Sequence, residues 1–148
     1  MATIHILYGT ESFNAQECAE RAGEVLNARG HAAQVFDMDD VDAAQLPQAP
    51  VVLVITSTFG DGEPPSNAQE LHAALMSDDA PRLEGVHFSV CALGDTSYET
   101  FAQCGKNFDA RLAELGAHRF APRQDCDVEY EEPFEAWLEQ VIANLAQL

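Results

Sequence analysis

The chain has 148 residues, 47% of them apolar and 22% charged, which is the size and composition of one folded domain. Its 25 acidic residues against 7 basic ones give a net charge of −18, which excludes nucleic-acid binding and attachment to anionic membranes by long-range repulsion and favours a monomer. No apolar run approaches the roughly 20 residues of a membrane-spanning helix, and no basic signal-peptide start is present. The four cysteines show no Cys-x-x-Cys pair or zinc-like spacing, so we expect a cytoplasmic protein with reduced thiols and no metal site.

Short apolar runs alternate with longer segments of helical period. Five runs are predicted strands, at residues 3–8, 32–36, 51–56, 86–93 and, more weakly, 119–121. The third and fourth runs are apolar nearly throughout, which is typical of parallel strands covered on both faces. We expect the chain to pass through the fifth strand without interruption.

Apolar residues recur at helical spacing between these runs, and the predicted helices cover residues 15–26, 71–76, 101–115 and 134–145. In the second, the apolar stripe consists of Leu71, Leu75 and Met76. Gly30 and Gly116 stand where the first and third helices should end. Strands joined by helices through right-handed crossovers predict an α/β fold with a doubly wound, five-stranded parallel sheet and helices on both faces.

Ligands of such sheets bind outside the carboxyl ends of the strands. Function is therefore expected in the five loops at residues 10–15, 37–42, 58–66, 94–100 and 123–132. These loops hold 14 of the 25 acidic residues, so the negative charge is concentrated at the expected ligand end.

The first loop, Thr10 to Ala15, is rich in short hydroxyl and amide side chains and joins a strand to a helix. Backbone N–H groups, the Thr10 and Ser12 hydroxyls and the helix N-terminus can together bind one phosphate without a lysine. The loop has no Gly-Lys pair, so it is not a Walker loop. An ordinary helix N-cap at Ser12 or Asn14 explains the same residues equally well.

The third and fourth loops each bring an aromatic residue to the edge of the sheet. Phe59 stands beside Gly60 and Gly62, where glycine permits close approach of the backbone to a ligand, and Tyr98 follows the fourth strand. Two aromatic side chains that flank one crevice favour a planar ring stacked between them.

The strings Tyr8 to Ala15, Ser57 to Pro65 and Leu93 to Phe101 resemble the short-chain flavodoxin family, especially the FMN-binding domain of sulfite reductase flavoprotein and other diflavin reductases. The likeness continues through residues 105–109, 112–117 and 125–130. It implies a single flavodoxin-like FMN-binding domain over residues 1–148, with strand order 2-1-3-4-5.

The resemblance also implies site residues. The FMN phosphate would be held by the first loop, the flavin ring would lie against the third and fourth loops with Phe59 and Tyr98 on opposite faces, and Asp95 would lie near the ring edge and Asp127 near the ribityl chain or the phosphate. The implied cofactor-binding residues are Thr10, Glu11, Ser12, Phe13, Asn14, Ala15, Ser57, Thr58, Phe59, Gly60, Leu93, Gly94, Asp95, Tyr98, Phe101 and Asp127.

Phe13 departs from the family pattern, which usually has glycine at this position. A Cβ here crowds backbone that approaches the phosphate, so we expect weaker FMN binding than is usual for the family.

The function implied by the resemblance is that of a redox carrier without substrate turnover of its own. It would shuttle single electrons from an NAD(P)H-dependent flavoprotein reductase to an acceptor with a basic docking surface, through the semiquinone/hydroquinone couple of FMN. The alternative is a flavodoxin-like accessory module that binds FMN weakly or supports another enzyme.

Other chemistry is less well supported by the residues. A response-regulator receiver needs acids after the first strand and an Asp after the third, where this chain has Tyr8-Gly9 and Thr56-Ser57, and it needs a lysine after the fifth. No histidine lies in the five loops and no Gly-x-Ser-x-Gly elbow is present, so a hydrolase lacks its base. Cys91 and Cys104 are interpreted as small core residues rather than redox thiols.

Overall fold

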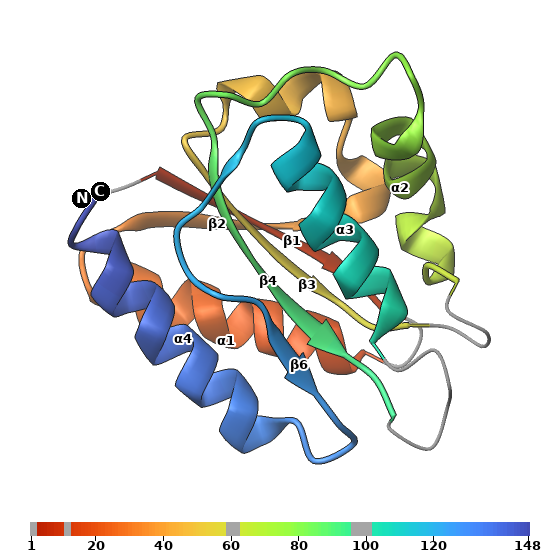
Figure 1. Ribbon diagram of the computed structural model, residues 1–148. Helices are drawn as coiled ribbons and strands as arrows, with labels where there is room; N and C mark the ends of the chain where they lie inside the picture. Colours follow the sequence, from red (N-terminus) through yellow and green to blue (C-terminus); the bar gives the residue numbers. More distant parts are fainter. Residues whose placement is uncertain (1–2, 11–12, 59–62, 96–101) are drawn as a thin grey trace.

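The computed structural model describes residues 3–10, 13–58, 63–95 and 102–148. Its strands form one parallel sheet in the order β2-β1-β3-β4-β5, with a further strand, β6, also paired to β4 (Figure 1). The strands are β1 (Thr3–Gly9), β2 (Ala32–Asp37), β3 (Val51–Thr56), β4 (His87–Leu93), β5 (His118–Arg119) and β6 (Gln124–Cys126). The predicted fold class and strand order are confirmed.

The fifth strand differs from the prediction because it consists of two short pieces. β5 pairs with the beginning of β4 and β6 with its end, and residues 120–123 lie between them. Pro122 in this gap has no N–H to donate to a ladder. The hydroxyl of Ser89 on β4 donates to the carbonyl of Ala121 at 3.0 Å, so a side chain links β4 to the chain in this gap.

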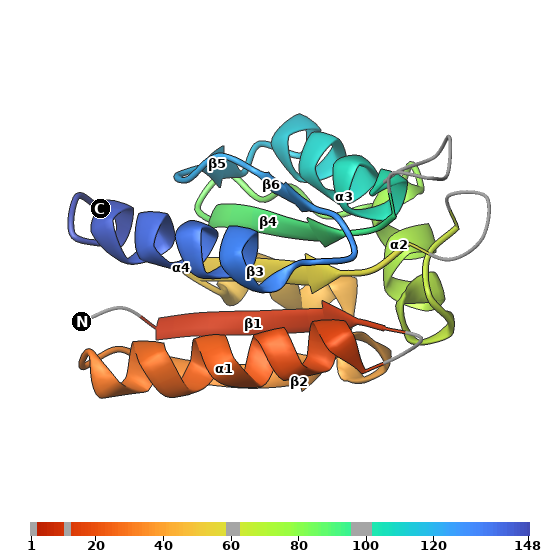
Figure 2. The same cartoon turned by 90° about the horizontal axis from the view of Figure 1, so that it is seen from below.

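Over the described ranges, α-helices cover both faces of the sheet, α1 and α4 on one and α2 and α3 on the other (Figures 1 and 2). These helices are α1 (Asn14–Ala28), α2 (Gln69–Met76), α3 (Gln103–Glu114) and α4 (Glu131–Leu145), and the short 3₁₀ helices are η1 (Met38–Asp40), η2 (Ala43–Gln48) and η3 (Ser66–Ala68). Met76 was expected in the apolar stripe of α2, but 37% of it is exposed because the helix ends there.

Side chains of the central strands alternate between two cores. Ile4, Ile6 and Leu53 pack beneath α1 and α4, whereas Leu7 and Val52 pack beneath α2 and α3. All six residues of β3 are buried, as expected for a strand covered on both faces.

The predicted helix ends at Gly30 and Gly116 are confirmed. Gly30 follows α1 with φ of 91° and Gly116 follows α3 with φ of 99°, a left-handed conformation that glycine adopts without a steric penalty. These turns return the chain from each helix to the amino-terminal edge of the sheet, so the loops before α1 and α3 lie at its carboxyl edge.

Candidate functional site

The carboxyl ends of β1, β3 and β4 meet at one edge of the sheet (Figure 2). Gly9 ends β1 in a narrow space, where an added Cβ would lie 2.8 Å from Oγ1 of Thr56 and 2.9 Å from Cβ of Ala68. Glycine at this position therefore permits the first loop to approach the loop after β3. The site residues inferred from the sequence that the structure describes are Thr10, Phe13, Asn14, Ala15, Ser57, Thr58, Leu93, Gly94, Asp95 and Asp127; Glu11, Ser12, Phe59, Gly60, Tyr98 and Phe101 lie outside the described residues.

Thr10 begins the first loop with an unusual hydroxyl group. Within the described ranges, its Oγ1 is buried and has no hydrogen-bond partner. A buried hydroxyl without a partner costs free energy, so it fits a position where a ligand completes the hydrogen bonding. Its backbone N–H is already used, because it donates to Oδ1 of Asn67 at 2.9 Å.

Helix α1 begins immediately after this loop. Its first intrahelical hydrogen bond within the described range runs from the N–H of Glu17 to the carbonyl of Phe13 at 2.9 Å. The N–H groups of Asn14, Ala15 and Gln16 in the first turn have no carbonyl four residues earlier within the helix. Together with the helix dipole, such groups form an anion-binding end.

Phe13 occupies the N-cap position of α1, and its backbone is left-handed, with φ of 68° and ψ of −7°. Its side chain makes no capping hydrogen bond, and 68% of the residue is exposed. Asn14 is the first residue of the helix, so the interpretation of Asn14 as an N-cap is wrong. Its Oδ1 accepts a hydrogen bond from the hydroxyl of Tyr130 at 3.4 Å, which joins the starts of α1 and α4.

Ser57 and Thr58 connect β3 to its neighbours. The backbone N–H and the hydroxyl of Ser57 both donate to the carbonyl of Gly9, at 2.9 and 3.3 Å. Oγ1 of Thr58 accepts from the N–H of Cys104 at 3.1 Å, so Thr58 caps the first turn of α3 from a distant loop. These hydrogen bonds link the end of β3 to the end of β1 and to the start of α3.

The loop after β4 begins with Leu93 and Gly94. Leu93 is 5% exposed and packs into the core beneath α1 and α4, so its backbone rather than its side chain lies at the edge. The N–H of Gly94 donates to the carbonyl of Cys126 at 2.9 Å, which brings the loop after β6 alongside. In that loop, Oδ1 of Asp127 accepts from the N–H of Val128 at 2.8 Å.

Two residues that the sequence did not single out, Asn67 and Asp37, belong to the same edge. The side-chain amide of Asn67 donates to Oδ1 of Asp37 at 3.1 Å and to the carbonyl of Tyr8 at 3.4 Å. Burial and the neighbouring Asp37 carboxylate raise the pKa of Tyr8. Asp37 falls in one of the five predicted loops, but Asn67 has no local signal that separates it from an ordinary helix-start residue.

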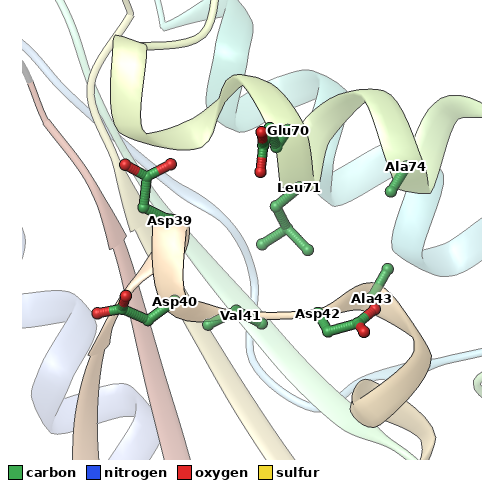
Figure 3. A pocket seen from close by; sticks show the side chains of 8 residues that line it. All are labelled: Asp39, Asp40, Val41, Asp42, Ala43, Glu70, Leu71 and Ala74. Atoms are coloured by element: carbon green, nitrogen blue, oxygen red, sulfur yellow. The ribbon is translucent and has the colours of Figure 1, made fainter.

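An acidic groove lies beside this edge, between the segment after β2 and helix α2 (Figure 3). Among the described residues that line it, Asp39, Asp40, Asp42 and Glu70 carry carboxylates and the others are apolar. Its residues are Asp39, Asp40, Val41, Asp42, Ala43, Glu70, Leu71 and Ala74. In the ranges that the structure describes, no three His, Cys, Asp or Glu side chains are arranged to hold a metal ion.

The interpretation of Cys91 and Cys104 as small core residues is confirmed, since both are fully buried. Burial raises the pKa of the Cys104 thiol to about 11 and that of Cys18 to about 12. Thiols with such pKa values are poor nucleophiles at neutral pH. Among the described helices, none is long and apolar enough to cross a membrane.

Comparison with known proteins places this geometry in a family context. The sequence model of the flavodoxin family matches residues 6–137. The chain is 48% identical over 142 residues to the sulfite reductase [NADPH] flavoprotein alpha-component of Bacillus subtilis (strain 168). The matched region covers 96% of the chain and 24% of that protein. It is 41% identical over 145 residues to the component of the same name from Thiocapsa roseopersicina, covering 98% of the chain and 28% of that protein. The chain thus spans about a quarter of the length of these relatives.

Solved structures agree with this result. A short-chain flavodoxin associated with a non-canonical PDU bacterial microcompartment superposes with a TM-score of 0.86 at 26% identity, covering 99% of this chain and 98% of that one. A cysteine-to-alanine mutant of flavodoxin from Pseudomonas aeruginosa superposes with a TM-score of 0.85 at 33% identity, covering 97% and 99% of the two chains.

Proposed function

The chain belongs to the flavodoxin family, whose cofactor is FMN, and we propose from this that it carries single electrons from an NAD(P)H-dependent flavoprotein reductase to an acceptor protein. It is an electron-transfer module of the flavodoxin type. The proposal adds that it moves between partners and has no substrate turnover of its own. The predicted cytoplasmic location, the monomeric state and the extent of the FMN-binding domain over residues 1–148 stay predictions.

The observation that carries the proposal is the phosphate-binding character of the first loop. The buried Oγ1 of Thr10 has no hydrogen-bond partner among the described residues. Thr10 precedes α1 in the sequence, and the first N–H groups of α1 have no acceptor within the helix. A hydroxyl and a helix N-terminus together suit a phosphate group. The residues present therefore fit FMN, and Thr10, Asn14 and Ala15 would hold its phosphate.

The flavin ring would lie at the ends of β3 and β4. Ser57 and Thr58 are fixed there by hydrogen bonds to Gly9 and Cys104, and Gly94 by its hydrogen bond to Cys126. FMN supplies a ring that accepts and releases electrons one at a time, and the protein tunes it through nearby hydrogen bonds and charge. The proposed contacts of Phe59, Gly60, Tyr98 and Phe101 complete this site.

Acidic side chains near the ring would oppose the build-up of negative charge on the bound flavin. The second one-electron reduction would therefore require a lower potential than the first. Acidic side chains also suit a basic partner. The groove lined by Asp39, Asp40, Asp42 and Glu70 has an apolar floor next to the cofactor edge, a combination that favours fast and weak docking. Such docking is what an electron carrier requires, because it has to release each partner.

A second candidate function rests on Phe13. The Cβ of Phe13, at the start of α1, crowds backbone that would approach the phosphate, at a position where the family usually has glycine. Weak FMN binding of this origin would favour an accessory module that supports another enzyme over a free carrier.

The decisive experiment is to add FMN to the purified protein, desalt it and record its visible spectrum during stepwise anaerobic reduction. Retained flavin that is reduced in two separate one-electron steps supports the carrier. Loss of the flavin on desalting favours the accessory module.

Docking is tested with a purified NADPH-dependent flavoprotein reductase. We expect the rate of flavin reduction to fall by about tenfold or more as salt is raised from about 50 to about 500 mM, because screening removes the steering field. The variant Asp39→Asn/Asp40→Asn should lower the rate at low salt, whereas the matched variant Asp78→Asn/Asp79→Asn, exposed at the far end of α2, should not. A rate independent of salt would refute steering.

A further inference from the structure

Asn67 lies on the short helix η3, between β3 and α2, yet its side chain reaches three other segments. Its Oδ1 accepts from the N–H of Thr10 at 2.9 Å, and its Nδ2 donates to Oδ1 of Asp37 at 3.1 Å and to the carbonyl of Tyr8 at 3.4 Å. One half-buried side chain therefore joins the end of β1, the first residue of the phosphate loop and the end of β2.

These contacts require an amide rather than any other polar group. Thr10 offers a backbone donor, so it needs an acceptor, whereas Asp37 and Tyr8 offer acceptors and need a donor. A carboxylate at position 67 would still accept from Thr10, but it would face the Asp37 carboxylate without a proton between them. Alanine would remove the hydrogen bond that Asn67 makes to each of the three groups.

We propose that Asn67 is the positioning residue of the phosphate site, which holds Thr10, the first residue of the phosphate loop, in place by linking it to Asp37. This inference rests on the proposed FMN site. With its N–H committed to Asn67, Thr10 has its hydroxyl left for the ligand, and that hydroxyl is the buried Oγ1 without a partner among the described residues. Asn67 thereby decides which group of Thr10 meets the phosphate.

Asn67 also lies between the Asp37 carboxylate and Thr10, where the phosphate of the proposed site would bring a second negative charge. Its Nδ2 lies against Asp37, which is half-buried and also accepts from the N–H of Asp39 at 2.8 Å. The N–H dipole of the amide thus offsets part of the negative potential of this carboxylate on the side of Thr10. Changing Asn67 to a carboxylate places a second negative charge beside an anionic ligand, so Asn67→Asp should harm phosphate binding more than Asn67→Ala.

The test compares FMN with riboflavin, which has the same ring but no phosphate. We expect Asn67→Ala to weaken FMN binding by about tenfold and Asn67→Asp by more, with riboflavin affinity changed by less than about threefold. Asn27→Ala is the matched control, because Asn27 makes the same two-sided amide contact with Ala33 at the opposite edge of the sheet, at 3.1 and 2.9 Å. It should leave the affinities for both flavins unchanged.

A second measurement needs no cofactor. Amide hydrogen exchange of the apoprotein should show a protected Thr10 N–H in the wild type, which loses its protection in Asn67→Ala and keeps it in Asn27→Ala. Equal losses of FMN and riboflavin affinity, or a Thr10 amide that exchanges at the same rate with and without Asn67, would overturn the inference. If the wild type binds no FMN while Thr10 is protected by Asn67, the proposed function fails and the structural link stands.

Discussion

Gly105 on α3 lies against Ala92 on β4 so closely that a Cβ added at position 105 would lie 2.9 Å from Cα of Ala92 and closer still to its Cβ. The first turn of α3 therefore sits directly on the sheet. Thr58 caps that same turn through the N–H of Cys104, so the close approach also positions the loop after β3.

Gly105→Ala should lower the free energy of unfolding by about 2 kcal/mol, because the new methyl group meets backbone that cannot move aside. Chemical denaturation measures this loss. Gly85→Ala is the control, since an added Cβ there meets nothing within 4 Å and Gly85 has no positive φ. Equal stability of the two variants would contradict the close packing of α3 on β4.

Phe13→Gly should bind FMN about fivefold more tightly than the wild type, because removal of the Cβ lets the backbone approach the phosphate more closely. The left-handed backbone of Phe13 is present without FMN, so its strain of about 1 kcal/mol lowers stability rather than affinity. Phe13→Ala removes the ring and keeps the Cβ, so it should bind FMN as the wild type does. A fluorescence titration that shows unchanged or weaker binding for Phe13→Gly would remove the Cβ at position 13 as a reason for weak affinity.

Asp109→Asn should lower the free energy of unfolding by about 3 kcal/mol. The Asp109 side chain is 7% exposed and accepts from Nε of Arg119 at 2.8 Å and from Nη1 of Arg123 at 3.1 Å. Loss of its charge removes the carboxylate partner of Arg119 and leaves Arg123 with its second partner, Asp125, alone. Glu135→Gln in the exposed pair with Arg21 should cost less than about 0.5 kcal/mol. Similar losses in both variants, measured by thermal or urea unfolding, would show that burial of Asp109 is not what matters.

The burial of His72 should make the stability of the protein depend on pH. Desolvation lowers the pKa of His72 below its ordinary value of 6.5, and its ring packs edge-on against Phe108 at 5.2 Å between centroids. The unfolded chain therefore binds the proton more readily, and the contribution of His72 to stability, present above pH 6.5, is lost as the pH falls through the folded pKa. His72→Leu should lose less stability than the wild type between about pH 7.5 and about pH 5. Parallel unfolding curves for the two proteins across this range would contradict the prediction.

Local pattern in the sequence predicted the architecture and the edge of the sheet that carries the site. The apolar β3 run, the helical stripes and the glycines at 30 and 116 each report on neighbouring residues, and the structure confirms them. These features are readable because the period of a strand or a helix and the backbone freedom of glycine are properties of the local chain.

Tertiary structure alone decided how the loops are joined. The hydrogen bonds from Thr10 to Asn67 and from Cys104 to Thr58 connect residues 57 and 46 positions apart. The hydroxyl of Ser89 links β4 to the chain where the last strand divides. The left-handed backbone of Phe13 likewise goes against the local preference of a phenylalanine. Such contacts depend on which strand ends become neighbours in the folded sheet, and no periodicity along the chain records that pairing.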